Sequence, residues 1–233
     1  MTTTHHAPTG NHRANPVPRA AVRTVRTAVL VLCAVALVAW PARAALFASI
    51  AGGTVGTPWA GLAGLVADKG LLVLVLITAA LVPFTWFRNR SKFWLLAAAG
   101  LGTVGAYGTS EAAKLIVTEE RPCRVIDVAT VLGCPVPGDW SWPSNHSTIA
   151  GALAVAVLLV APRLWPAVAP LALVIAGARV AAGVHYVHDV ASGLALGVLL
   201  TSLVALTLHA AGRRFTRRST VRPSPAARRT TGR

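Results

Sequence analysis

The feature that most constrains this chain is a succession of long apolar stretches. A helix needs about 20 mostly apolar residues to cross the hydrocarbon core of a bilayer. The sequence offers six such stretches, at residues 27–47, 70–87, 93–115, 147–162, 164–184 and 189–210. The first is interrupted by Pro41 and Arg43, and the fourth is short. The predicted fold is therefore all-α, a polytopic membrane protein with a six-transmembrane-helix bundle over residues 27–211.

The distribution of charge predicts how this bundle is oriented. The formal net charge is +15, and most of the cations lie in both ends of the chain, in the connection 88–92 and at Arg163. Positively charged connections face the cytoplasm, so both termini are expected to be cytoplasmic in a multi-pass plasma (inner) membrane protein. The seven acidic residues then fall near the outer side: Asp68, Glu111, Glu119, Glu120, Asp127, Asp139 and Asp189. Residues 1–26 and 212–233 are predicted to be disordered basic cytoplasmic tails.

The same positive charge bears on the partners of the chain. Basic ends beside anionic lipid headgroups account for it, so membrane lipids are expected as partners and nucleic acid is not. A second interpretation of the N-terminus stays open, because the apolar run 28–40 followed by Ala42-Arg43-Ala44 resembles a signal peptide with its cleavage site. Cleavage would leave five helices and break the agreement between the basic connections and an even helix count. The sequence leaves the oligomeric state open.

Ionisable groups near membrane helices are functional candidates, and here they form three clusters. The first is Lys114 with Arg121-Pro122, at the outer end of the third stretch. Seven residues make almost two helical turns, which predicts that both cations share one helical face and that Pro122 helps to end the helix. Taken alone, the pair could equally be two interfacial side chains that reach water.

The second cluster, Pro143-Ser144-Asn145-His146-Ser147, directly precedes the fourth stretch. Ser144 or Asn145 can cap the helix that begins here. The free N–H groups and the positive dipole end of such a helix make a natural phosphate cradle, with His146 in the first turn. An ordinary cap with an incidental histidine is the plainer interpretation.

The third cluster consists of Arg179, His185 and Asp189, between the fifth and sixth stretches. A spacing of four places His185 and Asp189 on one face if the helix begins by residue 185. The carboxylate can then accept one ring N–H and leave the other ring nitrogen as a lone pair. Gly183 offers the break that the return turn needs. An arginine this close to the membrane suggests a bound anion.

Cys123 and Cys134 share the predicted outer loop between the third and fourth stretches. That compartment can be oxidising, so the two thiols form a possible disulfide. Two free thiols remain the alternative.

In order, the three clusters resemble the signature of the type 2 phosphatidic acid phosphatase superfamily, which reads K-x6-R-P, then P-S-G-H, then S-R-x5-H-x3-D. Here it appears as Lys114-x6-Arg121-Pro122, then 143–146, then Ala178-Arg179-x5-His185-x3-Asp189. Asn145 replaces the glycine and Ala178 replaces the serine. These departures bear on phosphate affinity and substrate fit more than on the chemistry.

The resemblance implies a membrane lipid phosphatase of the undecaprenyl-diphosphate or phosphatidylglycerophosphate phosphatase kind, with its active site on the extracytoplasmic side. His185, helped by Asp189, would form a phosphohistidine, while His146 would protonate the leaving oxygen, which predicts a bell-shaped pH profile. The expected phosphate-binding residues are Lys114, Arg121, Ser144, Asn145 and Arg179. No metal and no other cofactor is expected.

Several alternatives stay open at this stage. His185, His188 and Asp189, with His146, could hold a metal, although the neighbouring cations would repel it; His188 is interpreted instead as an interfacial residue. A lipid alcohol could replace water as the acceptor, which would make the chain a phosphotransferase, and a non-enzymatic lipid-phosphate binder or transporter would use only the cations. Among substrates, undecaprenyl or decaprenyl diphosphate is preferred. Phosphatidic acid, phosphatidylglycerol phosphate and smaller prenyl phosphates remain.

Overall fold

The structure is a computed structural model that describes residues 19–220, with side chains for 21–212. Its described part contains helices and no strand. The elements are α1 (Arg19–Ala39), α2 (Arg43–Thr54), α3 (Ala60–Arg88), α4 (Arg90–Val117), α5 (Pro122–Val125), α6 (Asn145–Val160), the short 3₁₀-helix η1 (Pro162–Leu164), α7 (Trp165–Ala181) and α8 (Val187–Thr220). The predicted all-α class is therefore what the described residues show.

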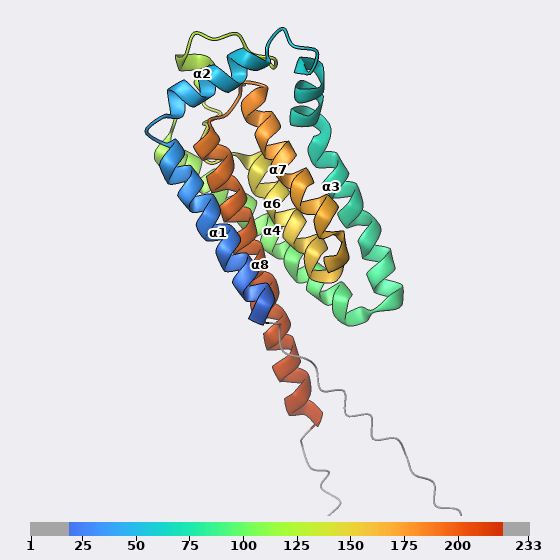
Figure 1. The fold of residues 1–233 in the computed structure, drawn as a ribbon. Coiled ribbons are helices and arrows are strands. Elements are labelled where there is room, and N and C mark those ends of the chain that lie inside the picture. Colours follow the sequence, from blue (N-terminus) through green and yellow to red (C-terminus); the bar gives the residue numbers. More distant parts are fainter. Residues whose placement is uncertain (1–18, 221–233) are drawn as a thin grey trace, which may run out of the picture.

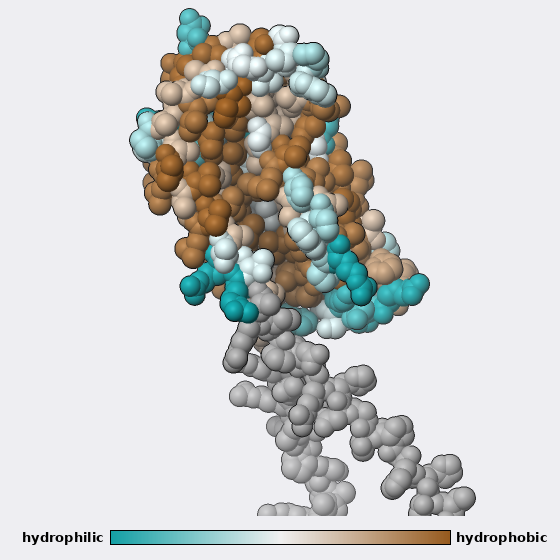
Figure 2. Space-filling view, viewed as in Figure 1, coloured by the Kyte–Doolittle hydropathy of each residue, from teal (hydrophilic) through white to brown (hydrophobic). Residues whose placement is uncertain are grey.

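Six helices, α1, α3, α4, α6, α7 and α8, run side by side, and α2 lies across the upper end of the bundle (Figure 1). The helices α4, α6 and α8 pack against one another at the centre, while α1 packs along α8 and α3 along α7. Hydrophobic residues cover most of the visible flank, and hydrophilic residues gather toward the two ends (Figure 2). An apolar flank between polar ends is the surface that a bilayer requires.

Four of these helices are long and apolar enough to cross a membrane: Ala21–Ala39, Ala60–Arg88, Pro162–Ala181 and Val187–Gly212. The sequence predicted six spans, and α4 and α6 are the two that fall outside this set. Helix α6 has only 16 residues, and ten of them are buried. A helix enclosed by its neighbours has little lipid to face, so it needs neither the length nor the hydropathy of a lipid-exposed span.

The ends of the first and last predicted stretches are corrected by the structure. The stretch 27–47 is two elements, because α1 stops at Ala39 and the turn around Pro41 precedes α2. Helix α1 also starts earlier than expected, at Arg19, inside the segment 1–26 that was predicted to be a disordered tail. At the other end of the chain, α8 continues to Thr220, into the predicted tail 212–233. Arginine and alanine are good helix formers, so helices need not end with their apolar stretch. Residues 1–18 and 221–233 lie outside the described part.

Helices α6 and α8 approach each other through glycine. A Cβ placed on Gly197 would lie 2.0 Å from the carbonyl oxygen of Thr148, and one on Gly151 would lie 2.7 Å from that of Leu194. One on Gly193 would lie 2.6 Å from the carbonyl oxygen of Ser144. Small residues let membrane helices pack with their backbones close together. This close packing places the N-terminal ends of α6 and α8, with their polar residues, against each other.

Candidate active site

The site lies at the end of the bundle where the α4–α6 connection and the α7–α8 turn meet. Cys123 and Cys134 are joined by a disulfide in the α4–α6 connection. Helix α4 ends at Val117, and Thr118 takes a left-handed conformation with φ of 47°. Arg121 therefore lies beyond the helix, and the predicted shared helical face with Lys114 is wrong. The loop, rather than the helix, carries the guanidinium back to the site.

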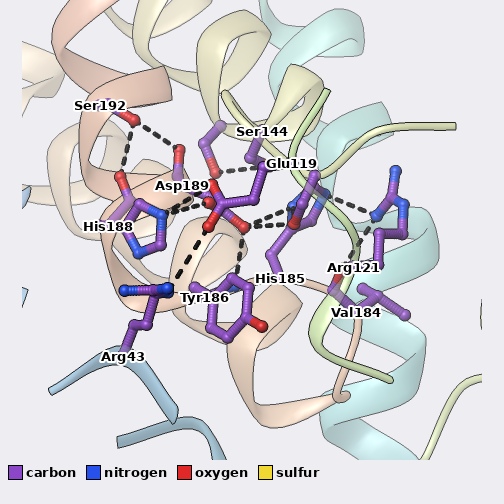
Figure 3. A network of polar contacts seen from close by, with 12 residues as sticks. Arg43, Glu119, Arg121, Ser144, Val184, His185, Tyr186, His188, Asp189 and Ser192 are labelled. Carbon is purple, nitrogen blue, oxygen red and sulfur yellow. Dashed lines mark hydrogen bonds and ion pairs between the residues drawn. The ribbon is translucent and has the colours of Figure 1, made fainter. Parts of the chain in front are cut away.

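A histidine, an aspartate and an arginine form the centre of the site (Figure 3). His185 Nδ1 lies 3.3 Å from Asp189 Oδ2, and Arg121 Nη1 lies 3.0 Å from His185 Nε2. All three side chains are buried. A guanidinium can only donate hydrogen bonds, so Nε2 must be the acceptor and Nδ1 must carry the proton toward Asp189. The neighbours thus fix the tautomer with a lone pair on Nε2.

Asp189 is held by contacts from several segments. Its Oδ2 accepts a hydrogen bond from the Tyr186 N–H at 2.8 Å and another from the Ser141 hydroxyl. The Ser144 N–H donates to the Asp189 carbonyl oxygen at 3.1 Å, which ties the start of α6 to the start of α8. Helix α8 begins at Val187, so the condition that it begin by residue 185 is not met. His185 reaches Asp189 from the turn before the helix instead.

Gly183 makes this turn possible. Its φ is +87°, and a Cβ at this position would meet the Thr130 side chain at 2.4 Å. Glycine is the residue that tolerates a positive φ without strain. The predicted break between Arg179 and His185 is therefore present, and it is packed beneath the α4–α6 connection.

Two cations of the site converge on one carboxylate. Asp139 Oδ1 lies 2.9 Å from Arg121 Nη2 and 3.3 Å from Lys114 Nζ, while Glu111 lies 3.5 Å from the same Lys114 nitrogen. Burial raises the pKa of Asp139, but Arg121 and Lys114 outweigh it, and the net pKa lies below its ordinary value. Lys114 and Arg121 thus form a cationic pair that already binds a carboxylate of the protein itself, that of Asp139.

A third cation and the second histidine lie on neighbouring helices. Arg179 is buried in α7, where its Nη1 donates to the Ala67 carbonyl oxygen at 3.1 Å, and its Nε has no hydrogen-bond partner among the described residues. His146, in the first turn of α6, is partly buried and interacts electrostatically with Arg179, Arg121 and Lys114. A buried N–H donor without a partner is costly, and a bound anion would satisfy it.

The start of α6 differs from the prediction in the roles of two side chains. Ser144 is the N-cap residue, but its side chain makes no capping hydrogen bond, and its hydroxyl accepts one from Ser147 at 3.2 Å. The Asn145 side chain accepts from the Ser110 hydroxyl at 2.7 Å and donates to Glu111. Both residues are thus bonded within the protein, and the Asn145 side chain is directed to α4 instead of capping the helix.

The structure adds four residues that the sequence motifs did not identify. Ser141 is fully buried and touches both Asp189 and, at 3.3 Å, His185 Nδ1. Asp139 contacts Lys114 and Arg121, and Glu119 contacts His188. His188 is 1% exposed, so its interpretation as an interfacial residue is wrong. One signal was available, since acidic residues are rare in this chain and those in the α4–α6 connection lie on both sides of Arg121 in the sequence.

Burial and charge also set the protonation state of the central histidine. His185 lies in the turn between α7 and α8, and its burial, together with Arg121, lowers its pKa to about 3 although Asp189 opposes the shift. The imidazole is therefore neutral at physiological pH, with its lone pair on Nε2, where it accepts the hydrogen bond from Arg121. A neutral imidazole next to clustered cations can act as a nucleophile toward an anion that the cations bind.

These features define a class, that of helical membrane proteins with buried cations, a histidine and an aspartate gathered at one end of the bundle. The match to known families is more specific: the family model of the PAP2 superfamily matches residues 91–213, and the chain belongs to this superfamily. The matched region contains all three motif clusters.

Two curated relatives and one solved structure illustrate the likeness. The decaprenylphosphoryl-5-phosphoribose phosphatase of Mycobacterium tuberculosis (strain CDC 1551 / Oshkosh) is 34% identical over 58% of this chain and 70% of its own length. The undecaprenyl-diphosphatase of Sulfolobus acidocaldarius is 33% identical over 40% of this chain and 45% of its own. The fold resembles the crystal structure of a transmembrane PAP2 type phosphatidylglycerolphosphate phosphatase from Bacillus subtilis, with a TM-score of 0.54, 20% identity, and coverage of 84% of this chain and 96% of that one.

Proposed function

We propose that the chain is a membrane lipid phosphatase that hydrolyses a lipid-linked phosphate at the extracytoplasmic face through a phosphohistidine. The observation that carries the proposal is the central arrangement: His185 is buried between Asp189 and Arg121, with its lone pair on Nε2. The relatives that carry phosphatase names support the same class of reaction.

The geometry supports a two-step reaction. In the first step His185 Nε2 attacks phosphorus, a P–N bond forms, and the bond to the leaving oxygen breaks. His146 gives its proton to that oxygen. In the second step His146 takes a proton from water, the water oxygen bonds to phosphorus, and the P–N bond breaks. Lys114, Arg121 and Arg179 neutralise the charge of the phosphoryl oxygens in both steps.

The positions of the charges support an assignment of the side of the membrane that the site faces. We infer six membrane-crossing helices, α1, α3, α4, α6, α7 and α8, with both termini in the cytoplasm and the site outside. The ends of α3 and α4 at Arg88 and Arg90 lie in a connection remote from the site, and Arg163 lies in another. Basic connections prefer the cytoplasmic side, which supports an extracytoplasmic location for His185.

A polyprenyl phosphate or diphosphate is the substrate that we favour. Two of the relatives carry names of polyprenyl phosphatases. An apolar cavity of about 690 Å³, lined mainly by α1, α4 and α8, adjoins the site at Trp142, Pro143 and His188. An apolar cavity that adjoins the site suits a headgroup in the site with its hydrocarbon chain in the membrane.

A phosphate-release assay on the purified protein in detergent tests this function. The substrates are undecaprenyl diphosphate, decaprenylphosphoryl-5-phosphoribose, phosphatidic acid and phosphatidylglycerol phosphate, each without added alcohol. We expect release from a polyprenyl substrate, loss of release in His185→Ala, and a radiolabelled phosphoprotein in wild type that is absent from that variant. Turnover by His185→Ala at a substantial fraction of wild type would contradict the assignment, and release only in the presence of an alcohol would favour a phosphotransferase.

A further inference from the structure

A second histidine contacts the aspartate of the site from the opposite side. His188 Nε2 lies 3.0 Å from Asp189 Oδ1 and 3.0 Å from Glu119 Oε2. His185 approaches the other oxygen, Oδ2, of the same carboxylate. Asp189 therefore bridges two imidazoles, and its exposed fraction is 0%. Nothing in the proposed reaction uses His188 or Glu119.

The surroundings of His188 hold its ring in one orientation. The Tyr186 ring stacks on it, with centroids 5.3 Å apart and an interplanar angle of 20°, and the Trp40 ring meets it edge-on at 4.5 Å. Glu119 is itself 3.8 Å from Arg43 Nε, and the Arg43 guanidinium lies over the Trp40 ring. Figure 3 shows the ring of His188 between Asp189 and the arginine of α2. The ring therefore has little freedom to turn away.

Chemistry fixes the location of the proton on this ring. Nε2 faces two carboxylate oxygens, and a lone pair there would face two negative groups; Nε2 must therefore carry a hydrogen and donate it. The charged groups around His188 are Glu119 from the α4–α6 connection, Asp189 from α8 and Arg43 from α2. Oδ1 of Asp189 has no hydrogen bond among the described residues, and its contact with His188 Nε2, 3.0 Å away, is an ion pair. Without His188, a buried carboxylate oxygen would be left without a partner, which is costly.

We propose that His188, supported by Glu119, is a positioning residue for the Asp189–His185 pair. Its Nε2–H, which is hydrogen-bonded to Glu119, also lies beside Oδ1 and attracts it. This attraction orients Oδ2 toward Nδ1 of His185 and aims the Nε2 lone pair of His185 at the phosphate pocket. During transfer the imidazole of His185 gains positive charge, and the oriented Asp189 stabilises it. His188 keeps its proton throughout and does not touch the phosphate. This inference rests on the proposed function.

The same three side chains could instead hold a cation. One ligand atom each from Glu119, His188 and Asp189 lies within 4.8 Å of the others. A cation would occupy the place of the Nε2 proton and withdraw Asp189 from its role beside His185. Removal of divalent ions should lower the activity only if these side chains hold a cation. The experiment therefore includes a measurement of activity in EDTA.

The test compares His188→Leu, which removes the donor, with His188→Gln, whose amide N–H can replace the Nε2–H. In the phosphate-release assay we expect His188→Leu to lower kcat by about 10- to 100-fold, the range found when a supporting partner of a functional ligand is removed. KM should stay within about twofold, because His188 does not contact the phosphate-binding cations. The rate of phosphoprotein formation should fall in parallel. His188→Gln should recover most of kcat, and Glu119→Gln should lie between the two.

The controls separate positioning from folding and from metal binding. His209→Leu, near the far end of α8, should leave kcat unchanged, and the thermal unfolding midpoints of all variants are measured in the same detergent. An equal loss of kcat in His188→Leu and His188→Gln together with equally lowered midpoints would show a structural role and overturn the proposal. Loss of wild-type activity in EDTA with recovery in zinc would overturn it in favour of a cation site.

The outcomes also distinguish this inference from the function on which it rests. If wild type releases phosphate and His185→Ala does not, but His188→Leu retains its kcat, the inference fails and the proposed function stands. If wild type releases no phosphate from any substrate, the proposed function fails and the inference falls with it.

Discussion

At the residue scale, Asp139 takes the place of an anion between Lys114 and Arg121. Its side chain is 41% exposed, so an incoming phosphate can displace it. Exposed ion pairs contribute about 0.2–1 kcal/mol, and we therefore expect Asp139→Asn to lower KM by about two- to fivefold with little change in kcat. Steady-state phosphate release over a range of lipid concentrations measures both constants.

Asp127→Asn is the matched control for this change, because Asp127 is an exposed acidic residue of the same connection with no ion pair or hydrogen bond among the described residues. Both substitutions remove one negative charge from the connection. An equal fall of KM in the two variants would show a general charge effect, and a rise of KM in Asp139→Asn would show that Asp139 helps to build the pocket.

His185 gives a second prediction at this scale, on stability. Its native pKa is about 3, because burial and Arg121 disfavour the charged form, whereas an unfolded histidine has a pKa of about 6.5. Between these values the unfolded chain binds a proton that the native chain does not, so the native state loses stability as pH falls below about 6.5. One such group contributes at most about 1.4 kcal/mol per pH unit.

Replacement of this group isolates its contribution. Thermal unfolding midpoints of wild type and His185→Gln in detergent are compared at several pH values between 6.5 and 4. The midpoint of wild type should fall more steeply with decreasing pH than that of the variant, while the two slopes should agree above pH 7.5. Parallel curves across the whole range would show that folding does not lower the pKa of His185.

At the scale of elements, the packing of α6 on α8 controls the geometry of the site. Gly197 leaves no room for a methyl group, since a Cβ there would lie 2.0 Å from the Thr148 carbonyl oxygen. Overpacking typically costs about 1–3 kcal/mol. Gly197→Ala should therefore lower the unfolding midpoint and also kcat, because any separation of α6 from α8 moves His146 away from His185.

Gly105→Ala is the control for this substitution. Gly105 lies within α4, and nothing lies within 4 Å of a Cβ placed there. Alanine has the higher helix propensity, so this variant should keep its activity and be as stable as wild type or slightly more so. Equal unfolding midpoints and equal kcat values in Gly197→Ala and Gly105→Ala would mean that the α6–α8 contact tolerates an added methyl group.

The elements also show what the sequence could and could not predict. Spacing placed Lys114, Arg121, His185 and Asp189 near helix ends, and the resemblance to the phosphatase signature implied that they form one site. The secondary structure on which these residues lie could not be predicted from the spacing. Arg121 returns from a loop after the left-handed residue Thr118, and His185 precedes α8 instead of lying on it.

Residues outside the motifs were missed for a related reason. Ser141 and Glu119 contact the site through the fold of the α4–α6 connection, in which the Ser141 N–H donates to the Glu119 carbonyl oxygen at 2.8 Å. Neither hydrophobic periodicity nor motif spacing predicts such a loop contact from the sequence. The interfacial interpretation of His188 failed because the ring lies between segments that are distant along the chain, next to Trp40 of the α1–α2 turn.

At the scale of the whole molecule, the remaining question is which side of the membrane the site faces. The disulfide between Cys123 and Cys134 and the polar site share one end of the bundle, whereas α8 ends at the other. A disulfide persists in an oxidising compartment, and the basic connections favour the cytoplasm at the opposite end. Both considerations predict that the α4–α6 connection is extracytoplasmic and that the chain ends are cytoplasmic.

Thiol labelling of intact cells tests this orientation. In a Cys33→Ala background, a membrane-impermeant reductant followed by an impermeant maleimide should label Cys123 and Cys134 without lysis. A second variant, with Cys33→Ala, Cys123→Ser, Cys134→Ser and Ser219→Cys, carries its single thiol near the end of α8 and should be labelled only after the membrane is disrupted. The reverse pattern would place His185 and its cations in the cytoplasm. The lipid pool that meets the site would then be the inner one, because a headgroup reaches a buried site only from the leaflet that the site faces.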